Sequence, residues 1–172
     1  MKLKQWVWAT GFSWGAWSLI ASGVLAAETV LLRYRGLGLP VPVEALQELA
    51  ETGEAPASID QILEASGQDP QDFQATLTRQ ISVNVNLLDR TLNSWPGEWA
   101  LDQVGEVIHP PSGEASRQAL RSALVLSAAD DAQISILEIL ENYPTRQVVL
   151  EVDKIEAAYN RLAALLRPFS LF

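Results

Sequence analysis

The stretch "ETVLLRYRGLGLPVPV", residues 28–43, contains two short extended arms around a glycine-containing turn. Side chains from Val30 to Arg35 alternate as they do along a β-strand, and the "RGLG" that overlaps the end of this arm supplies turn residues. The second arm contains Pro40 and Pro42, which have no N–H to donate and therefore confine it to a sheet edge or a strand end. The stretch predicts an N-terminal β-hairpin.

Helical periodicity dominates the chain after the hairpin. Apolar residues recur every three or four positions from Val43 onward, and glycines and prolines interrupt the pattern at short intervals. One more extended segment, "TRQVVLEV", lies at residues 145–152, and we expect it to pair with the hairpin in a small sheet. The predicted fold class is therefore mainly α: a compact bundle of about seven short helices with a small β element.

Capping residues predict where several of these helices begin. Asp69 at the cap and Pro70 at the first helical position form a strong helix start. Ser58 or Asp60 is expected to cap the preceding helix, and Ser112 the alanine-rich helix that follows it along the chain. The segment 96–108 is expected to be one helix whose inward face comprises Ala100, Leu101, Val104, Val107 and Ile108.

The chain is acidic and contains no cysteine. Its 172 residues include 21 Asp and Glu against 12 Lys and Arg, which gives a net charge of −9 at pH 7. Such a surface repels phosphate backbones and anionic membrane faces, so a nucleic-acid partner is not expected. Without cysteine the chain has no disulfide, no thiolate catalyst and no thiolate-bound metal. We predict no cofactor and no metal site.

The first residues have the pattern of a secretory leader. Lys2 and Lys4 precede an uncharged apolar run at residues 6–27, which ends in small side chains. We predict a signal peptide at residues 1–27, one helix-rich domain at 28–172, and export to the periplasm or the thylakoid lumen. A retained membrane anchor is the alternative, because about 20 apolar residues suffice to cross a bilayer as a helix.

One short motif raises the question of catalysis. The segment "GFSWG", residues 11–15, fits the G-x-S-x-G nucleophile elbow, which requires a strand–turn–helix context. Ser13 lies inside the leader, so we interpret the match as chance. A serine triad also needs an imidazole, and the only histidine is His109, just before Pro110 and Pro111. That position predicts a polar residue near a helix C-terminus, and no catalytic residue is predicted.

The C-terminal tail is unusually apolar. The segment "RPFSLF" places Phe169, Leu171 and Phe172 after Pro168. A tail of this kind either folds back onto the core or binds a partner. These three residues are the candidate partner-docking residues.

Three segments together resemble a known family: "ETVLLRYRGLGLPVPVEALQELAETGE", "GEVIHPPSGEASRQALRSALVLSAADD" and "ILEILENYPTRQVVLEVDKI". They are similar to a cyanobacterial domain of unknown function that commonly precedes the catalytic domain of exported α/β-hydrolases of the lipase-like or dienelactone-hydrolase-like kind. The resemblance covers nearly all of residues 28–172. In the longer relatives the catalytic domain carries the triad, so the resemblance implies the accessory half here, and no active-site residue carries over.

Three functions stay open at this point. The first is an exported, non-catalytic interaction module whose partner is an α/β-hydrolase or another envelope protein. The second is a carrier of a small apolar ligand, a lipid or a pigment, held between helices. The aromatic residues that would line such a space are Trp95, Trp99, Phe73 and Tyr159. The third is a weak hydrolase.

Overall fold

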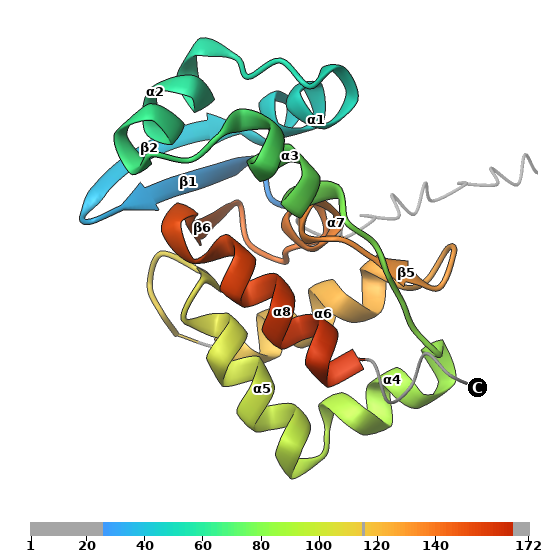
Figure 1. The fold of residues 1–172 in the computed structure, drawn as a ribbon. Coiled ribbons are helices and arrows are strands. Elements are labelled where there is room, and N and C mark those ends of the chain that lie inside the picture. Colours follow the sequence, from blue (N-terminus) through green and yellow to red (C-terminus); the bar gives the residue numbers. More distant parts are fainter. Residues whose placement is uncertain (1–25, 115, 167–172) are drawn as a thin grey trace, which may run out of the picture.

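A computed structural model of the chain describes residues 26–114 and 116–166, and these form a mainly helical fold around a small mixed sheet (Figure 1). Eight α-helices lie within the described residues. The predicted fold class is confirmed. Figure 1 shows the hairpin and the first three helices gathered at one end of the molecule, with α4, α5, α6 and α8 at the other.

The main sheet has the strand order β2-β1-β6-β4. Strands β1 (Thr29–Tyr34) and β2 (Leu37–Pro42) form the predicted antiparallel hairpin, and β6 (Gln147–Glu151) is the predicted second extended segment. It pairs with β1 in parallel, Val30 opposite Val148, so the two ends of the fold meet in the sheet. The hairpin turn places Arg35 at φ 47° and Gly36 at φ 85°, the left-handed pair that matches the twist of the flanking strands.

Within the described residues, three short strands lie between the helices. Strand β4 (Ile108–His109) pairs antiparallel with β6, so the predicted helix over 96–108 is wrong beyond residue 105. Strand β3 (Ile81–Ser82) pairs with β5 (Gln133–Ile134) in a separate two-stranded sheet. Both pairings join residues far apart in the sequence, and helical periodicity carries no information about them.

The helices are short and follow one another with brief connections. The first three, α1 (Val43–Thr52), α2 (Ala57–Ser66) and α3 (Pro70–Thr78), lie near the hairpin. The other elements are α4 (Val85–Leu92), α5 (Trp95–Gly105), α6 (Ser116–Ser127), α7 (Ile136–Glu141), the 3₁₀ turn η1 (Val152–Lys154) and α8 (Ile155–Leu166).

The helix starts test the predicted caps. Asp69 caps α3 as predicted: its Oδ1 accepts hydrogen bonds from the backbone N–H of Gln71 at 2.9 Å and of Asp72 at 3.2 Å. Neither Ser58 nor Asp60 caps α2, because the helix begins earlier, after Pro56, which provides no side-chain cap. Nor does Ser112 cap α6, because that helix begins at Ser116 and the Ser112 hydroxyl accepts from the Glu114 N–H instead.

One hydrophobic core joins the sheet to the helices. The inner sheet face contributes Val30, Leu32, Val148 and Leu150, all with no exposed surface. Phe73 of α3 and Tyr143, which follows α7, are the largest fully buried side chains. The ring of Tyr143 therefore fixes the "YPT" turn that leads into β6. The buried face of α8 belongs to the same core through Ile155, Ala158, Leu162 and Leu166, which positions one side of the site described next.

Candidate functional site

An apolar groove of about 480 Å³ lies between α8 and the corner formed by α4 and α5. We call it the α5–α8 groove. Its lining residues are Thr91, Ser94, Pro96, Trp99, Ala100, Gln103, Arg161, Ala164 and Leu165. The volume falls in the range of ligand and peptide sites, roughly 300–1,000 Å³.

The corner between α4 and α5 forms one wall of the groove, and hydrogen bonds fix its shape. Ser94 is the cap of α5: its Oγ accepts from the Gly97 N–H at 3.3 Å and donates to the Thr91 carbonyl oxygen at 2.6 Å. The first turn of α5 also lies so close to the end of α4 that a Cβ on Gly97 would clash with the Thr91 carbonyl. Glycine therefore allows the tight corner from which Pro96 and Trp99 project.

The opposite wall is the last part of α8. Arg161 ties this wall to α5, because its Nη1 donates to the Gln103 carbonyl oxygen at 3.1 Å and lies 3.6 Å from Glu106 Oε2. Ala164 on α8 and Ala100 on α5 have side chains that end at Cβ, which leaves space between the two helices. The result is an apolar groove with one cationic group at its rim.

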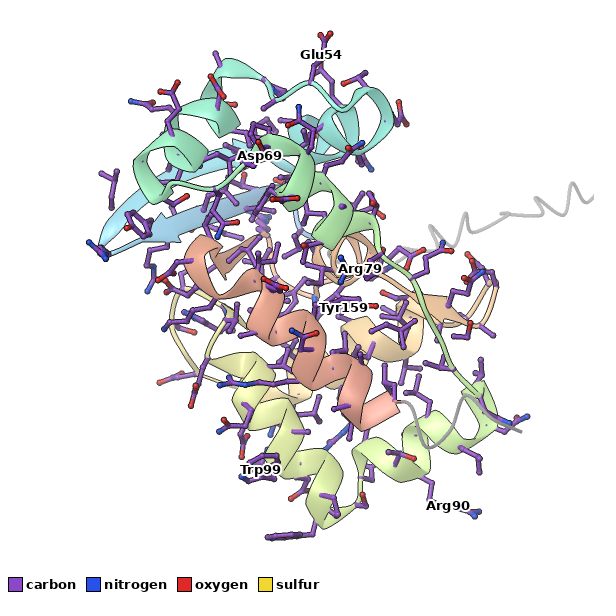
Figure 2. The ribbon with its side chains drawn as sticks, viewed as in Figure 1. Glu54, Asp69, Arg79, Arg90, Trp99 and Tyr159 are labelled. Carbon is purple, nitrogen blue, oxygen red and sulfur yellow. The ribbon has the colours of Figure 1, made fainter. Side chains whose placement is uncertain are left out.

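Two tryptophans of α5 have exposed side chains. Trp99 is 60% exposed and Trp95 is 80% exposed, and Figure 2 shows Trp99 on the outer surface of α5. A tryptophan left in water next to an apolar hollow is typical of binding surfaces, since it offers a large area to bury on contact. Trp99, which lines the hollow, marks the α5–α8 groove as the candidate functional site.

The four aromatic residues considered for a ligand space do not come together. Phe73 lies in the core with no exposed surface, and Trp95 is not among the lining residues. The Arg79 guanidinium lies over the ring of Tyr159, 4.7 Å from the ring centroid. Figure 2 labels both residues. Only Trp99 lines the groove, so the predicted aromatic set is wrong.

His109 lies in strand β4, not near a helix C-terminus as predicted. Its Nδ1 donates to the carbonyl oxygen of Pro110 at 2.9 Å, while Nε2 lies 3.9 Å from Glu151 Oε1. Arg33 Nη1 contacts the same carboxylate oxygen at 3.3 Å. Both ring nitrogens thus face acceptors, and in the described part of the chain neither has a hydroxyl partner. A general base for a serine needs such a hydroxyl within hydrogen-bond reach.

The acidic residues of α7 have structural partners. Glu138 Oε2 accepts from the Ser135 N–H at 2.7 Å while Ser135 Oγ accepts from the Glu138 N–H, which completes a capping box. Glu141 Oε1 accepts from Gln47 Nε2 of α1 at 2.8 Å. Across residues 26–114 and 116–166, no group of three His, Asp or Glu side chains is placed to hold a metal ion.

Some predicted features fall outside the residues that the structure describes. These are the leader, with Ser13 and its elbow-like motif, and the docking candidates Phe169, Leu171 and Phe172. Among the helices that are described, none is both long enough and apolar enough to cross a membrane.

Fold and site together define a mainly helical domain with a small mixed sheet and an apolar surface groove. The chain belongs to the DUF1400 family, described as an alpha/beta hydrolase of unknown function, whose model matches residues 26–151. The resemblance inferred from the sequence is confirmed at this level. No curated protein and no solved structure matches the chain. The family match ends before α8, so one wall of the groove lies outside it.

Sequence reasoning missed the groove although one signal pointed to it. Trp99 falls off the buried face of its helix, which is unusual for so large an apolar residue. Leu165 continues the helical spacing of the apolar residues Ile155, Ala158 and Leu162, yet it is only half-buried and lines the groove. Which helix faces Trp99 depends on tertiary packing, so the periodicity of a single segment could not supply it.

Proposed function

We propose that this chain is an exported, non-catalytic interaction domain whose α5–α8 groove binds an apolar segment of a partner protein. The observation that carries the proposal is Trp99, 60% exposed at the edge of an apolar hollow. Tryptophan is enriched among residues that dominate binding energy, particularly beside a pocket from which water is excluded on contact.

The partner we favour is the catalytic domain of an α/β-hydrolase. The family description links the chain to such enzymes, and His109, the only histidine, has a carbonyl and a carboxylate as its partners. A catalytic site would need the imidazole to contact a nucleophile. A module of this kind acts by positioning or stabilising a hydrolase in the periplasm or the thylakoid lumen.

A second candidate function is the binding of a small apolar ligand such as a lipid or pigment. It is favoured by the groove volume of about 480 Å³, which suits a small molecule as well as a peptide. Native mass spectrometry of the protein purified from its own host distinguishes the two. A bound mass that is lost on substituting Trp99 supports the carrier, whereas an empty protein supports the interaction domain.

Binding to a hydrolase tests the main proposal directly. The full chain is immobilised, and the probe is the catalytic domain of an exported α/β-hydrolase from the same genome, with Kd measured by biolayer interferometry. We expect Trp99→Ala to raise Kd about tenfold or more. The matched control is Val85→Ala, which alters another exposed apolar residue, 40% exposed and outside the groove. Equal effects of the two substitutions would refute the groove as the docking site.

An esterase assay tests the non-catalytic part of the proposal. A nitrophenyl ester is incubated with the full chain and with the His109→Gln variant. We expect no turnover above a heat-inactivated sample for either protein. Hydrolysis that disappears in the variant would make the chain an enzyme and would overturn the proposal.

A further inference from the structure

The α4–α5 corner, residues 91–97, carries Trp95, the most exposed large apolar side chain among the described residues. Trp95 is 80% exposed, and Trp99, four positions further along α5, is 60% exposed. Residues four apart lie on the same side of a helix, so the two rings belong to one aromatic surface. We propose that this surface docks on a membrane of neutral lipid, with Trp95 inserted at the level of the headgroups. The inference goes beyond the proposed function, because Trp95 lies outside the groove lining and its contact with lipid requires no hydrolase.

The corner lies at one end of the molecule. Figure 1 shows the connection between α4 and α5 at the end opposite the hairpin, α1 and α2. Trp99 lies about 6 Å further from the corner along α5, at 1.5 Å per residue. A flat lipid surface can therefore contact Trp95 first and reach Trp99 next. Tryptophan suits this place, since its ring is apolar while its N–H still finds a partner in the wet headgroup layer.

The charge at the corner differs from that of the whole chain. Residues 91–97, "TLNSWPG", contain no ionisable side chain, although the full chain has a net charge of −9. The ionisable residues that border the corner, together with those that pair with them, are three acids and three arginines, whose charges cancel: Asp89, Glu98, Asp102, Arg90, Arg117 and Arg121. Anionic lipid would repel the acidic remainder of the chain, so a neutral bilayer is the membrane that fits this surface.

Arginines lie at both borders of the corner. Glu98 follows it, and its carboxylate oxygens lie 3.3 Å from Arg117 Nη1 and 3.9 Å from Arg121 Nη2. Arg90 precedes the corner, makes no ion pair with a described residue and projects outward from α4 in Figure 2. A guanidinium in this place can donate to the phosphate of a zwitterionic lipid while its apolar stem covers the headgroup boundary.

Most hydrogen-bond donors of the corner are paired within the protein, and contact with lipid requires such pairing. The backbone N–H groups that donate to an oxygen of a neighbouring residue are those of Asn93, Ser94, Gly97 and Glu98. Pro96 has no N–H to leave unpaired. The side-chain amide of Asn93 donates to the Asp89 carbonyl oxygen at 2.8 Å and to Asp89 Oδ1 at 2.9 Å. The corner can therefore lose water at little cost in hydrogen bonds.

Site-specific fluorescence tests the contact in the full chain, which has no native cysteine. The variant Pro96→Cys carries an NBD label beside Trp95. The matched control Leu37→Cys carries the label at a residue of the hairpin that is 57% exposed, at the opposite end of the molecule. Both are mixed with phosphatidylcholine vesicles whose acyl chains carry a nitroxide. Because an anchor at residues 6–27 would also bring the chain to a vesicle, contact is measured at the label itself. We expect quenching to be about threefold stronger at position 96 than at position 37.

A substitution tests whether the ring of Trp95 is the anchor. Trp95→Ala in the Pro96→Cys background should lower quenching at a fixed lipid concentration about threefold or more, because the ring supplies most of the apolar area that the corner exposes. Val85→Ala alters another exposed apolar residue, at the start of α4, and should leave the quenching unchanged. Equal effects of the two substitutions would refute Trp95 as the membrane contact.

The remaining outcomes separate neutral lipid from other partners. Equal quenching at positions 96 and 37 would overturn the proposal. A response of the label at position 96 to the hydrolase catalytic domain, without quenching by vesicles, would also overturn it and would assign the corner to a protein. Replacing about a third of the lipid with phosphatidylglycerol should not strengthen the quenching, and a clear gain would overturn the assignment to neutral lipid.

Discussion

Gly97 in the first turn of α5 packs against the backbone carbonyl of Thr91 at the end of α4, closer than any side chain would allow. The contact sets the angle between the two helices and so the shape of the wall that carries Trp99. The absence of a side chain on Gly97 therefore determines the shape of the candidate binding surface.

The Gly97–Thr91 contact predicts a difference between two glycines of the same helix. Gly97→Ala should destabilise the fold by about 2 kcal/mol or more, because the backbone of α4 must move to admit the methyl group. Gly105→Ala should be neutral or stabilising by up to about 1 kcal/mol, since its Cβ would meet Leu120 and Ser116 at 3.6 and 3.7 Å. Urea denaturation of both variants measures the difference. Similar midpoints would contradict the close approach.

The difference in burial between two aromatic residues predicts different losses of folding stability when each is replaced by alanine. Phe73→Ala should lower the free energy of unfolding by about 3–5 kcal/mol, because the ring is fully buried in the core. Trp99→Ala should change it by less than about 1 kcal/mol, because most of that side chain is already in water. Thermal and urea unfolding give both values. A large loss for Trp99→Ala would mean that this ring supports the fold instead of a binding surface.

The cap of α3 predicts a modest, residue-specific effect. Asp69→Ala removes the acceptor for the Gln71 and Asp72 N–H groups and should cost about 1 kcal/mol. Asp69→Asn keeps an oxygen at the same place and should retain most of the stability. If alanine and asparagine have the same effect, the charge of the aspartate matters and the cap does not.

The ion pair between α5 and α6 predicts a pH-dependent contribution to stability. Arg117 donates from Nε to Asp102 Oδ1 at 2.8 Å and also contacts Oδ2, and this hydrogen bonding lowers the pKa of Asp102 below its ordinary 3.8. A carboxylate with a lowered pKa stabilises the fold above its unfolded-state pKa, and the effect is lost as the pH falls through the lower folded-state pKa.

Asp102→Asn should therefore be less stable than the native chain at about pH 7, and the gap should close well below pH 3.8. Both partners are solvent-accessible, so the gap should be small and should shrink with added salt. Urea midpoints at about pH 7 and about pH 2.5 test this. A gap of the same size at both values would argue against the ion pair.

The hydroxyl of Tyr143 predicts a stabilising substitution. Its oxygen is buried, and within the described residues it has no hydrogen-bond partner, while burial raises the pKa of the phenol. Tyr143→Phe should stabilise the fold by about 1 kcal/mol, because it removes an unpaired buried polar group and leaves the ring in place. Differential scanning calorimetry measures the change. A loss of stability would show that the hydroxyl has a partner such as an ordered water molecule.

Local signals predicted the parts of this fold that local interactions determine. The hairpin followed from alternation and the "RGLG" turn, and the start of α3 followed from Asp69 and Pro70. The early start of α2 after Pro56 and the late start of α6 at Ser116 show the limit of this reasoning. A serine or aspartate offers a cap, but packing of the helix face decides where the helix begins.

The features that the sequence did not predict, strand β4 and the groove, depend on contacts between residues far apart in the sequence. Ile108 and His109 leave the helical pattern because β6 supplies partners for their backbone, and β6 lies about forty residues further along the chain. The α5–α8 groove has the same origin, since Trp99 and Leu165 line one groove only after both helices pack on the core. The sequence could identify Trp99 as exceptional on its helix, but not the helix that faces it.

The outer strand of the hairpin limits how this protein can associate. The Val43 N–H donates to the Glu28 carbonyl oxygen, so the backbone N–H groups of every second residue in β2 face β1. The backbone nitrogens of Pro40 and Pro42 face the opposite, outer edge of the strand. The outer edge of β2 therefore has almost no backbone N–H with which to pair another strand, which prevents fibril growth and strand exchange along this edge. Association at this edge of the sheet must therefore use side chains, such as the exposed Leu37, and not strand addition.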